Sequence, residues 1–194
     1  MATVFIDRDG TINEDRGFTH KKENLVFLPG AIEGLKMMSN EGMGLVIFTN
    51  QSGIGRGLFT TEDFLGFMDG LISELKHEDI KIDEVLHCPH TPEDKCECRK
   101  PSPQLLENYA YDNCLDLSEC FVIGDRLSDI ETGINAGCTT ILINKEGPDM
   151  SALAKATTEA LQDAQNKIFP DFVAKDMTEA AEWIIIQKNM KEKD

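Results

Sequence analysis

Short apolar runs alternate with longer segments of helical character along this 194-residue chain. Such alternation is typical of a parallel sheet with helices on both faces. The apolar runs predict strands at 4–6, 45–48, 82–86, 121–123, 140–143 and 172–173. Between and after them, helices are predicted at 30–40, 61–78, 103–111, 129–136, 151–167 and 178–188. We therefore predict a Rossmann-like α/β fold and, because no linker divides the chain, a single domain over residues 1–194.

The first predicted strand ends abruptly in two aspartates, Asp7 and Asp9. Because side chains alternate along a strand, both carboxylates should leave it on the same side, and Gly10 lets the chain turn away at once. Open α/β sheets bind ligands at the carboxyl ends of their strands. Two carboxylates there could hold a hard divalent cation or act as a nucleophile and an acid/base, with ordinary surface aspartates as the alternative.

Three further fragments follow in order. They are a strand ending in Thr49-Asn50, the triplet 99–101 (Arg-Lys-Pro), and a strand followed by Gly124-Asp125-x-x-x-Asp129. Together with the first fragment they resemble the four motifs of the haloacid dehalogenase (HAD) superfamily phosphatases, over roughly residues 3 to 145. The resemblance implies a HAD-like fold. No insertion after the first two strands is large enough for a substantial cap domain, which implies a minimal cap or none and an open site.

The resemblance also implies roles for four residues. Asp7 would be the nucleophile that takes up the phosphoryl group, and Asp9 the acid/base. Thr49 and Lys100 would bind phosphate oxygens. The simpler alternatives are that Thr49 only caps a turn, and that Lys100 is a solvated charge whose task Arg99 performs.

A Mg²⁺ ion is implied by the same resemblance, since carboxylates and water suit this cation. Its ligands would be Asp7, the backbone carbonyl of Asp9, and Asp125. Asp129 would support that shell, or would only cap the following helix.

A cysteine-rich loop is the second strong signal, with Cys88 and His90 followed by Cys96 and Cys98. Three thiolates and one imidazole can close a tetrahedral Zn²⁺ shell. Disulfides and unrelated free thiols are the alternatives, and the lack of a visible signal peptide argues against disulfides. The loop resembles that of zinc-containing HAD phosphatases acting on histidinol phosphate or on heptose 1,7-bisphosphate. There the zinc is structural, so here it would position the cations at 99–100.

The substrate class follows from charge and from the same resemblance. A formal charge of −16 argues against broad nucleic-acid binding, and it means that local cations must capture a phosphorylated metabolite. We expect four residues beside the motifs to contact the substrate: Asn50, Gln51, Arg56 and Arg99. The glycine-rich stretch 53–57 is expected to be a flexible loop near the pocket.

Two segments favour different substrates. The polar stretches 13–20 and 51–57 resemble the heptose enzymes and carry Arg16 and Arg56, which could meet a second phosphate. The short spacer between His90 and Cys96 resembles the histidinol-phosphate enzymes of histidine biosynthesis. We predict heptose 1,7-bisphosphate as substrate, with the 7-phosphate removed and the 1-phosphate held near Arg16 or Arg56. Histidinol phosphate is the alternative, and a non-catalytic binding protein on the same fold is a remote one.

The remaining expectations concern location and assembly. No apolar run approaches the 18 residues of a membrane span. With no signal peptide visible, we expect a cytoplasmic protein that binds neither membranes nor nucleic acid. A monomer is favoured, although the oligomeric state is left open.

Overall fold

The computed structural model describes residues 2–145 and 168–191, and within them six strands form one wholly parallel sheet. The strand order is β3-β2-β1-β4-β5-β6, which places β1 beside β2 and β4. The strands are β1 (Thr3–Ile6), β2 (Gly44–Asn50), β3 (Glu84–Cys88), β4 (Phe121–Gly124), β5 (Thr139–Ile143) and β6 (Phe172–Ala174). The predicted α/β class is confirmed.

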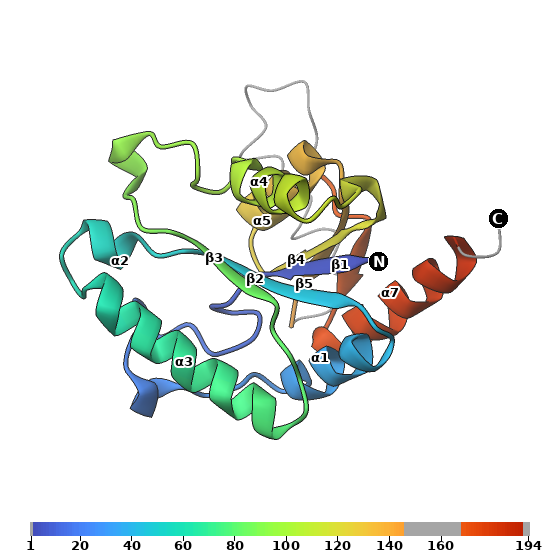
Figure 1. Cartoon of the computed structure of the whole chain (residues 1–194), viewed down its shortest axis with the longest axis horizontal. Coiled ribbons are helices and arrows are strands. Elements are labelled where there is room, and N and C mark those ends of the chain that lie inside the picture. The colour runs from blue at the N-terminus through green and yellow to red at the C-terminus, as the bar shows by residue number, and fades with distance from the viewer. Residues whose placement is uncertain (1, 146–167, 192–194) are drawn as a thin grey trace.

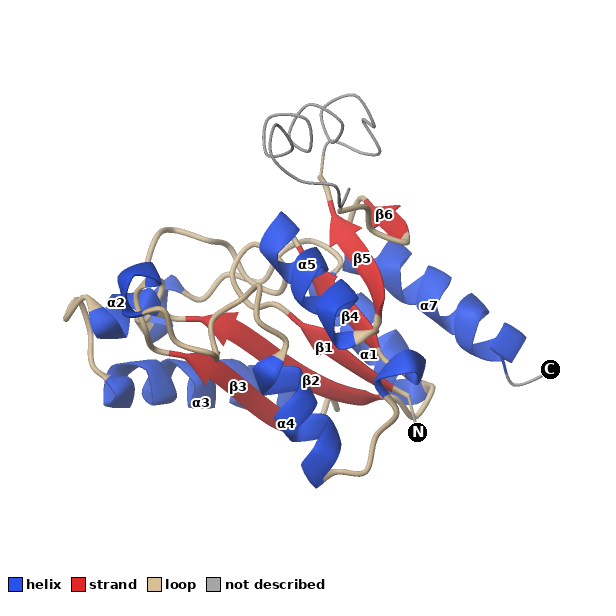
Figure 2. Cartoon of the chain, turned by 90° about the horizontal axis from the view of Figure 1, so that it is seen from above, coloured by secondary structure: helices blue, strands red, loops and turns tan. Residues whose placement is uncertain are grey.

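Helices cover both faces of the sheet, as Figures 1 and 2 show. In Figure 1, α4 and α5 lie above the sheet, whereas α1, α3 and α7 lie below it. The helices are α1 (Ala31–Asn40), α2 (Ser52–Gly55), α3 (Thr61–His77), α4 (Gln104–Asp112), α5 (Leu127–Ala136) and α7 (Met177–Lys191). The sheet is thus the middle of three layers, and its loops meet at the carboxyl ends of the strands.

Strand β1 is apolar over residues 4–6 because both of its faces are buried. Val4 and Ile6 join the core cluster on the side of α1, α3 and α7, while Phe5 joins the cluster on the side of α4. All three side chains are fully buried. A parallel strand covered on both faces needs apolar residues at every position, so alternation with polar residues is lost.

Most predicted elements agree with the structure to within two residues. Helix α3 begins with a capping box in which Thr60 and Asp63 bond each other's backbone. Helix α5 ends at Gly137, which adopts a left-handed conformation with φ of 77°. The predicted helix at 151–167 lies outside the described residues, so the single domain over 1–194 stays a prediction.

Three expectations were wrong in detail. The third strand starts at Glu84 rather than at 82, because the Asp83 carboxylate accepts the Leu45 N–H (3.1 Å) before regular pairing begins. The stretch after β2 is not simply a flexible loop, because 52–55 form the short helix α2. The closing helix, predicted at 178–188, runs from Met177 to Lys191, and its apolar residues do not keep to one face, since Ile184 is buried while Ile186 is 56% exposed.

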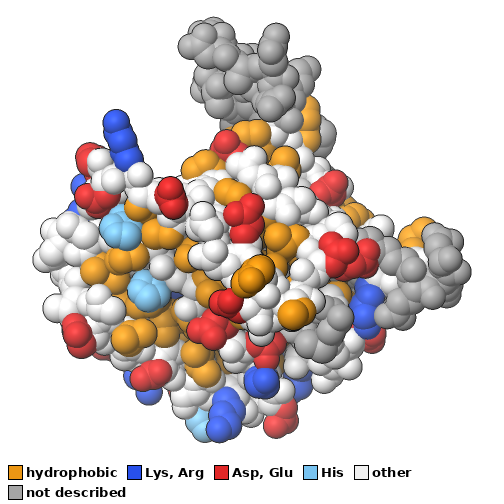
Figure 3. Space-filling view, turned by 45° about the horizontal axis from the view of Figure 1, so that its top comes forward, with side chains coloured by type: hydrophobic (Ala, Val, Ile, Leu, Met, Phe, Trp, Pro, Cys, Tyr) orange, Lys and Arg blue, Asp and Glu red, His pale blue; other side chains and the backbone are white. Residues whose placement is uncertain are grey.

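The surface is acidic, and acidic side chains are spread over the face drawn in Figure 3 rather than gathered in one patch. Hydrophobic groups on that face stand between polar ones. Among the described residues, no helix is long and apolar enough to cross a membrane.

Close packing of α1 against α7 depends on Gly34. A Cβ built there would lie 2.3 Å from the backbone oxygen of Met177, which cannot move without shifting α7. We expect Gly34→Ala to lower the free energy of unfolding by about 1–3 kcal/mol through overpacking. Gly66→Ala in α3 is the matched control, because a Cβ there meets nothing within 4 Å. That change should stabilise the protein by about 0.4–1 kcal/mol. Urea denaturation measures both, and an equal effect would contradict the packing argument.

Candidate active site

A cavity of about 350 Å³ opens at the carboxyl ends of the central strands. Residues from all four predicted motifs contribute to its wall, namely Asp7, Asp9, Thr49, Asn50, Lys100 and Asp129. Asp7 directly follows β1, Thr49 and Asn50 end β2, and Asp129 lies in the first turn of α5. The parallel sheet therefore brings together residues that are up to 122 positions apart in the sequence, since Asp7 and Asp129 line the same cavity.

Lys100 is the centre of a buried charge cluster. Its Nζ lies 2.5 Å from Asp7 Oδ1 and 2.6 Å from Asp129 Oδ1, and both carboxylates are nearly inaccessible to solvent. The ammonium also lies 4.2 Å from the centroid of the Phe48 ring. Burial lowers the pKa of Lys100, but the Asp129 and Asp7 carboxylates outweigh that effect and hold the pKa above its ordinary value. The lysine is therefore charged in this site.

The pKa values of Asp7 and Asp125 also rise, and for a carboxyl group a rise disfavours the charged form. Burial raises the pKa of Asp7 to about 8, against the lowering effect of Lys100, and the negative charge of Asp129 adds to the rise. Burial, and next the negative charge of Asp129, raise the pKa of Asp125 to about 6. One lysine thus does not neutralise the three acidic groups that converge here.

The same three aspartates fit a hard divalent cation. Ligand oxygens of Asp7, Asp125 and Asp129 all lie within 4.8 Å of one another. The buried Oδ1 of Asp125 has no hydrogen-bond partner among the described residues. A buried oxygen without a partner is costly, and a carboxylate cluster of this kind is the donor set that Mg²⁺ prefers.

Gly10 lets the first and fourth motifs approach each other. Its φ is 87°, a conformation that favours glycine, and a Cβ there would lie 2.1 Å from Asp125 Oδ2. Any side chain at this position would separate Asp125 from the end of β1.

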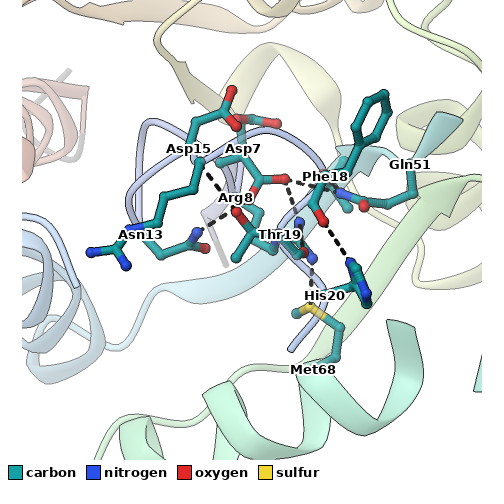
Figure 4. Close-up of polar contacts among 12 residues, drawn as sticks. Asp7, Arg8, Asn13, Asp15, Phe18, Thr19, His20, Gln51 and Met68 are labelled. Atoms are coloured by element: carbon teal, nitrogen blue, oxygen red, sulfur yellow. Dashed lines mark hydrogen bonds and ion pairs between the residues drawn. The ribbon is translucent and has the colours of Figure 1, made fainter. Parts of the chain in front are cut away.

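The carboxylate of Asp9 is held by three donors, which come from Arg8, Asn13 and Gln51, all three labelled in Figure 4. Arg8 forms an ion pair with Oδ2, Gln51 Nε2 donates to Oδ2 over 3.1 Å, and Asn13 Nδ2 donates to Oδ1 over 3.1 Å. Gln51 also donates to Thr49 Oγ1 over 2.8 Å. Gln51, predicted as a substrate contact, lines the cavity and also connects the first and second motifs.

Asn50 has a second task besides lining the cavity. Its Oδ1 accepts the Lys100 N–H over 3.1 Å, and its Nδ2 donates to the Lys100 carbonyl over 3.4 Å. This reciprocal pair fixes the backbone that carries the buried ammonium. The sequence placed Asn50 among substrate contacts, and this backbone role was not predicted.

The four residues of the cysteine-rich loop meet at one point. Cys88 Sγ lies 3.5 Å from Cys96 Sγ and 3.1 Å from Cys98 Sγ, and His90 Nδ1 lies 3.2 Å from Cys98 Sγ. No disulfide joins them, and all four ligand atoms lie within 4.8 Å of one another. Sulfurs about 2.3 Å from a tetrahedral zinc would be about 3.8 Å apart, so the cluster could close around one ion with small adjustments.

The arginines are arranged differently from the sequence expectation. Arg99 lines the cavity, whereas Arg56 is absent from its lining and lies 3.9 Å from Glu93. Arg16, also absent from the lining, pairs with Glu14 over 2.8 Å. A further lining residue, Arg126, was missed, although it stands inside the fourth motif directly after Asp125.

Comparison with known proteins agrees with this geometry. A family model described as polynucleotide kinase 3 phosphatase matches residues 3–137, and a HAD-hydrolase-like model matches residues 97–180. The first match covers more than half of the chain and includes every motif that lines the cavity. The chain belongs to the HAD phosphatase family. It is therefore a phosphoric monoester hydrolase, as the motifs predicted.

Several relatives within the HAD phosphatases are named for their activities. A probable D-glycero-D-manno-heptose-1,7-bisphosphate 7-phosphatase from Thermoplasma volcanium is 44% identical over 65% of this chain and 86% of its own length. The Yersinia pestis D-glycero-beta-D-manno-heptose-1,7-bisphosphate 7-phosphatase is 32% identical over 82% of this chain and 88% of its own. A crystal structure of the B. bronchiseptica D,D-heptose 1.7-bisphosphate phosphatase, complexed with magnesium and phosphate, superposes with a TM-score of 0.81. That match has 29% identity and covers 96% of this chain and 99% of the other.

The reciprocal bonds of Asn50 generate a prediction for this HAD phosphatase. Asn50→Ala frees the Lys100 backbone, and small displacements of a catalytic group cost up to about 100-fold in rate. We expect kcat/KM for phosphate release from 4-nitrophenyl phosphate to fall about 10- to 100-fold. Asn108→Ala on α4 is the control, because that exposed side chain only accepts a bond from Gln104. An unchanged rate in Asn50→Ala would mean that Lys100 is held without this clamp.

Proposed function

We propose that this protein is a Mg²⁺-dependent phosphatase that removes the 7-phosphate from D-glycero-D-manno-heptose 1,7-bisphosphate. The observation that carries the proposal is that relatives named for this activity, at 32–44% identity, match most of the chain. The cavity that contains Asp7, Asp9 and Lys100 supports it, because these are the groups that phosphoryl transfer through an aspartate needs.

In the first step, Asp7 attacks the phosphorus and the bond from phosphorus to the sugar oxygen breaks. Asp9 gives its proton to the leaving oxygen, so the sugar departs as a neutral alcohol. Lys100 lies against the attacking carboxylate, where its charge offsets the charge on the phosphoryl oxygens. Thr49 lines the same wall and could donate its hydroxyl to a phosphoryl oxygen.

In the second step, a water molecule attacks the aspartyl phosphate. Asp9, now deprotonated, takes a proton from that water, and the bond between phosphate and Asp7 breaks. Inorganic phosphate leaves, and both aspartates return to their starting states. The same carboxyl thus acts first as an acid and then as a base, which requires that it stay in one place.

Mg²⁺ is the cation we propose for the three-aspartate cluster. Asp7, the backbone carbonyl of Asp9, and Asp125 would hold it, with Asp129 in support. A bound Mg²⁺ supplies the positive charge that lets an anionic carboxylate approach an anionic phosphate.

Zinc is the metal we propose for the cysteine-rich loop, in a structural role. A shell of three sulfurs and one nitrogen leaves no open position for a reacting group. The loop continues directly from Cys98 into Arg99 and Lys100, so the metal would stabilise the backbone that carries both cations.

The second phosphate of a bisphosphate needs cationic partners near the cavity. Arg99 and Arg126 line it, and Arg126 is 62% exposed and pairs with Asp15 over 2.7 Å. These two guanidiniums replace Arg16 and Arg56 as our candidates for the retained 1-phosphate. Guanidiniums bind phosphate well, whereas they would repel the ammonium group of histidinol phosphate.

The nucleophile is tested by substitution. We expect Asp7→Asn to lower phosphate release to below about a thousandth, as loss of a catalytic nucleophile does, with the fold and the zinc content preserved. Asp9→Asn is the matched control, because it should still become labelled slowly at Asp7 by radioactive phosphate from the substrate. Near-normal turnover by Asp7→Asn would exclude the covalent route.

The zinc proposal is tested by elemental analysis of protein purified without added metal. We expect one tightly bound zinc per chain. Cys96→Ser should lower the occupancy and reduce activity, although no group in contact with phosphate is changed. Cys114→Ser is the control, since this exposed cysteine lies outside the cluster. A fully active protein without zinc would contradict the proposed role.

The substrate is tested by measuring kcat/KM for heptose 1,7-bisphosphate and histidinol phosphate side by side. A tenfold ratio corresponds to about 1.4 kcal/mol of transition-state preference. We expect at least this ratio in favour of the heptose, and a loss of most of it in Arg126→Ala. A tenfold preference for histidinol phosphate would assign the enzyme to the alternative substrate.

A further inference from the structure

Arg8, between the two aspartates of the first motif, is fully buried. The alternation of β1 continues through it, so that Arg8 turns toward α3 while Asp7 and Asp9 line the cavity. Its guanidinium carbon lies 4.8 Å from the Phe67 ring centroid and 5.7 Å from that of Phe64. Nη1 approaches the sulfur of Met68 at 3.8 Å. An arginine therefore occupies a place in the core where an apolar side chain would pack.

The polar end of Arg8 makes two contacts that an apolar residue cannot make. Nη2 forms an ion pair with Asp9 Oδ2 and donates to the carbonyl of Thr19 over 2.9 Å (Figure 4). The other donors to Asp9, from Asn13 and Gln51, are neutral amides. Arg8 is thus the charged partner of the carboxyl that the proposed function uses twice.

The second contact reaches the loop over the cavity. Thr19 lies in the 14–20 loop, of which Asp15, Gly17 and Phe18 line the cavity. The loop is further held by Thr19 Oγ1, which accepts the Arg16 N–H over 3.2 Å. A single guanidinium nitrogen therefore fixes the acid/base carboxyl relative to the loop that faces the substrate.

We propose that Arg8 is a positioning residue, which holds Asp9 in place for proton transfer and ties it to the 14–20 loop. This rests on the proposed role of Asp9 as acid and base. The aromatic rings of α3 keep the guanidinium in place, since a cation over a ring face is attracted to it. Burial of the charge is costly unless it is paired, so the ion pair and the ring contacts explain why it is tolerated.

The inference predicts a dependence on the leaving group. In the first step Asp9 gives its proton to the leaving oxygen. A leaving alcohol or phenol needs this proton far more than a leaving 4-nitrophenol does. A misplaced Asp9 should therefore slow phosphoryl transfer from phenyl phosphate while sparing 4-nitrophenyl phosphate. A defect in the fold or in phosphate binding would slow both substrates equally.

Arg8→Met is the test variant, because methionine keeps much of the length and the packing against the rings but donates nothing. We expect kcat/KM for phenyl phosphate to fall about ten times more than kcat/KM for 4-nitrophenyl phosphate, which is less than the 10²- to 10⁴-fold cost of losing acid/base catalysis altogether, because Asp9 is displaced but still present. For 4-nitrophenyl phosphate, kcat should fall more than kcat/KM, because Asp9 is still needed as base in the second step. Arg8→Lys, which keeps the charge, should restore part of both losses.

Two controls separate positioning from stability. Leu75→Ala removes a buried apolar side chain about two turns along α3 from Phe67, and it should lower the melting temperature while changing both substrates by a similar factor. Arg8→Met in an Asp9→Asn background should add no further leaving-group dependence, because Arg8 acts through Asp9. If Arg8→Met does not fold, Arg8→Lys alone carries the test, with an intermediate leaving-group dependence expected.

Each outcome decides between clear alternatives. Equal losses for both substrates in Arg8→Met, or in Arg8→Lys where only that variant folds, would show a purely structural role and overturn the inference. If Asp9→Asn itself shows no leaving-group dependence, the proposed acid role of Asp9 fails, whatever Arg8 does. A dependence in Asp9→Asn that is absent from both Arg8 variants would leave the proposed function standing and reject Arg8 as its positioning residue.

Discussion

The buried contact of Lys100 with Asp7 and Asp129 is the interaction on which the rest of the site depends. Breaking a buried ion pair by removing one partner costs about 3–5 kcal/mol, so this lysine is held firmly to its partners. Yet the cluster has more negative charge than Lys100 can neutralise, because Asp125 lies beside Asp129. The excess negative charge therefore favours the binding of a cation at the point where a phosphate must enter.

The site is assembled from several loops, and their mutual bonds make it one unit. Asn50 fixes the Lys100 backbone, and Gln51 joins Thr49 to Asp9. Gly10 leaves the space that the Asp125 carboxylate occupies. The sheet supplies the frame, since the carboxyl ends of β2, β1 and β4 are neighbours. Rigid elements hold catalytic groups more accurately than isolated loops do, and here the polar side chains extend that rigidity into the loops.

Local sequence patterns predicted the parallel sheet, the cavity residues of all four motifs and the convergence of the cysteine-rich loop. They succeeded because strand alternation and ligand spacing are local properties. Contacts between distant segments could not be read in this way. Arg126 was missed although it stands inside the fourth motif, because the motif does not show which way the side chain after Asp125 turns, and Arg56 was expected there although it pairs with Glu93 outside. The burial of Arg8 likewise depends on α3, about 60 residues further along the chain.

The loop from Cys88 to Lys100 is closed at both ends by bonds to the last residue of β2 and the residue that follows it. Gln51 donates its N–H to the Cys88 carbonyl over 2.7 Å, and Asn50 bonds the Lys100 backbone. An ion held by the sulfurs and a phosphate held by Lys100 would therefore act on the same closed ring of chain. Linkage between two binding sites is reciprocal, so each would strengthen the other by the same factor. A chelator should therefore remove the ion more slowly when the site is saturated with phosphate. Substrate turnover would in this way help to keep the ion in the loop.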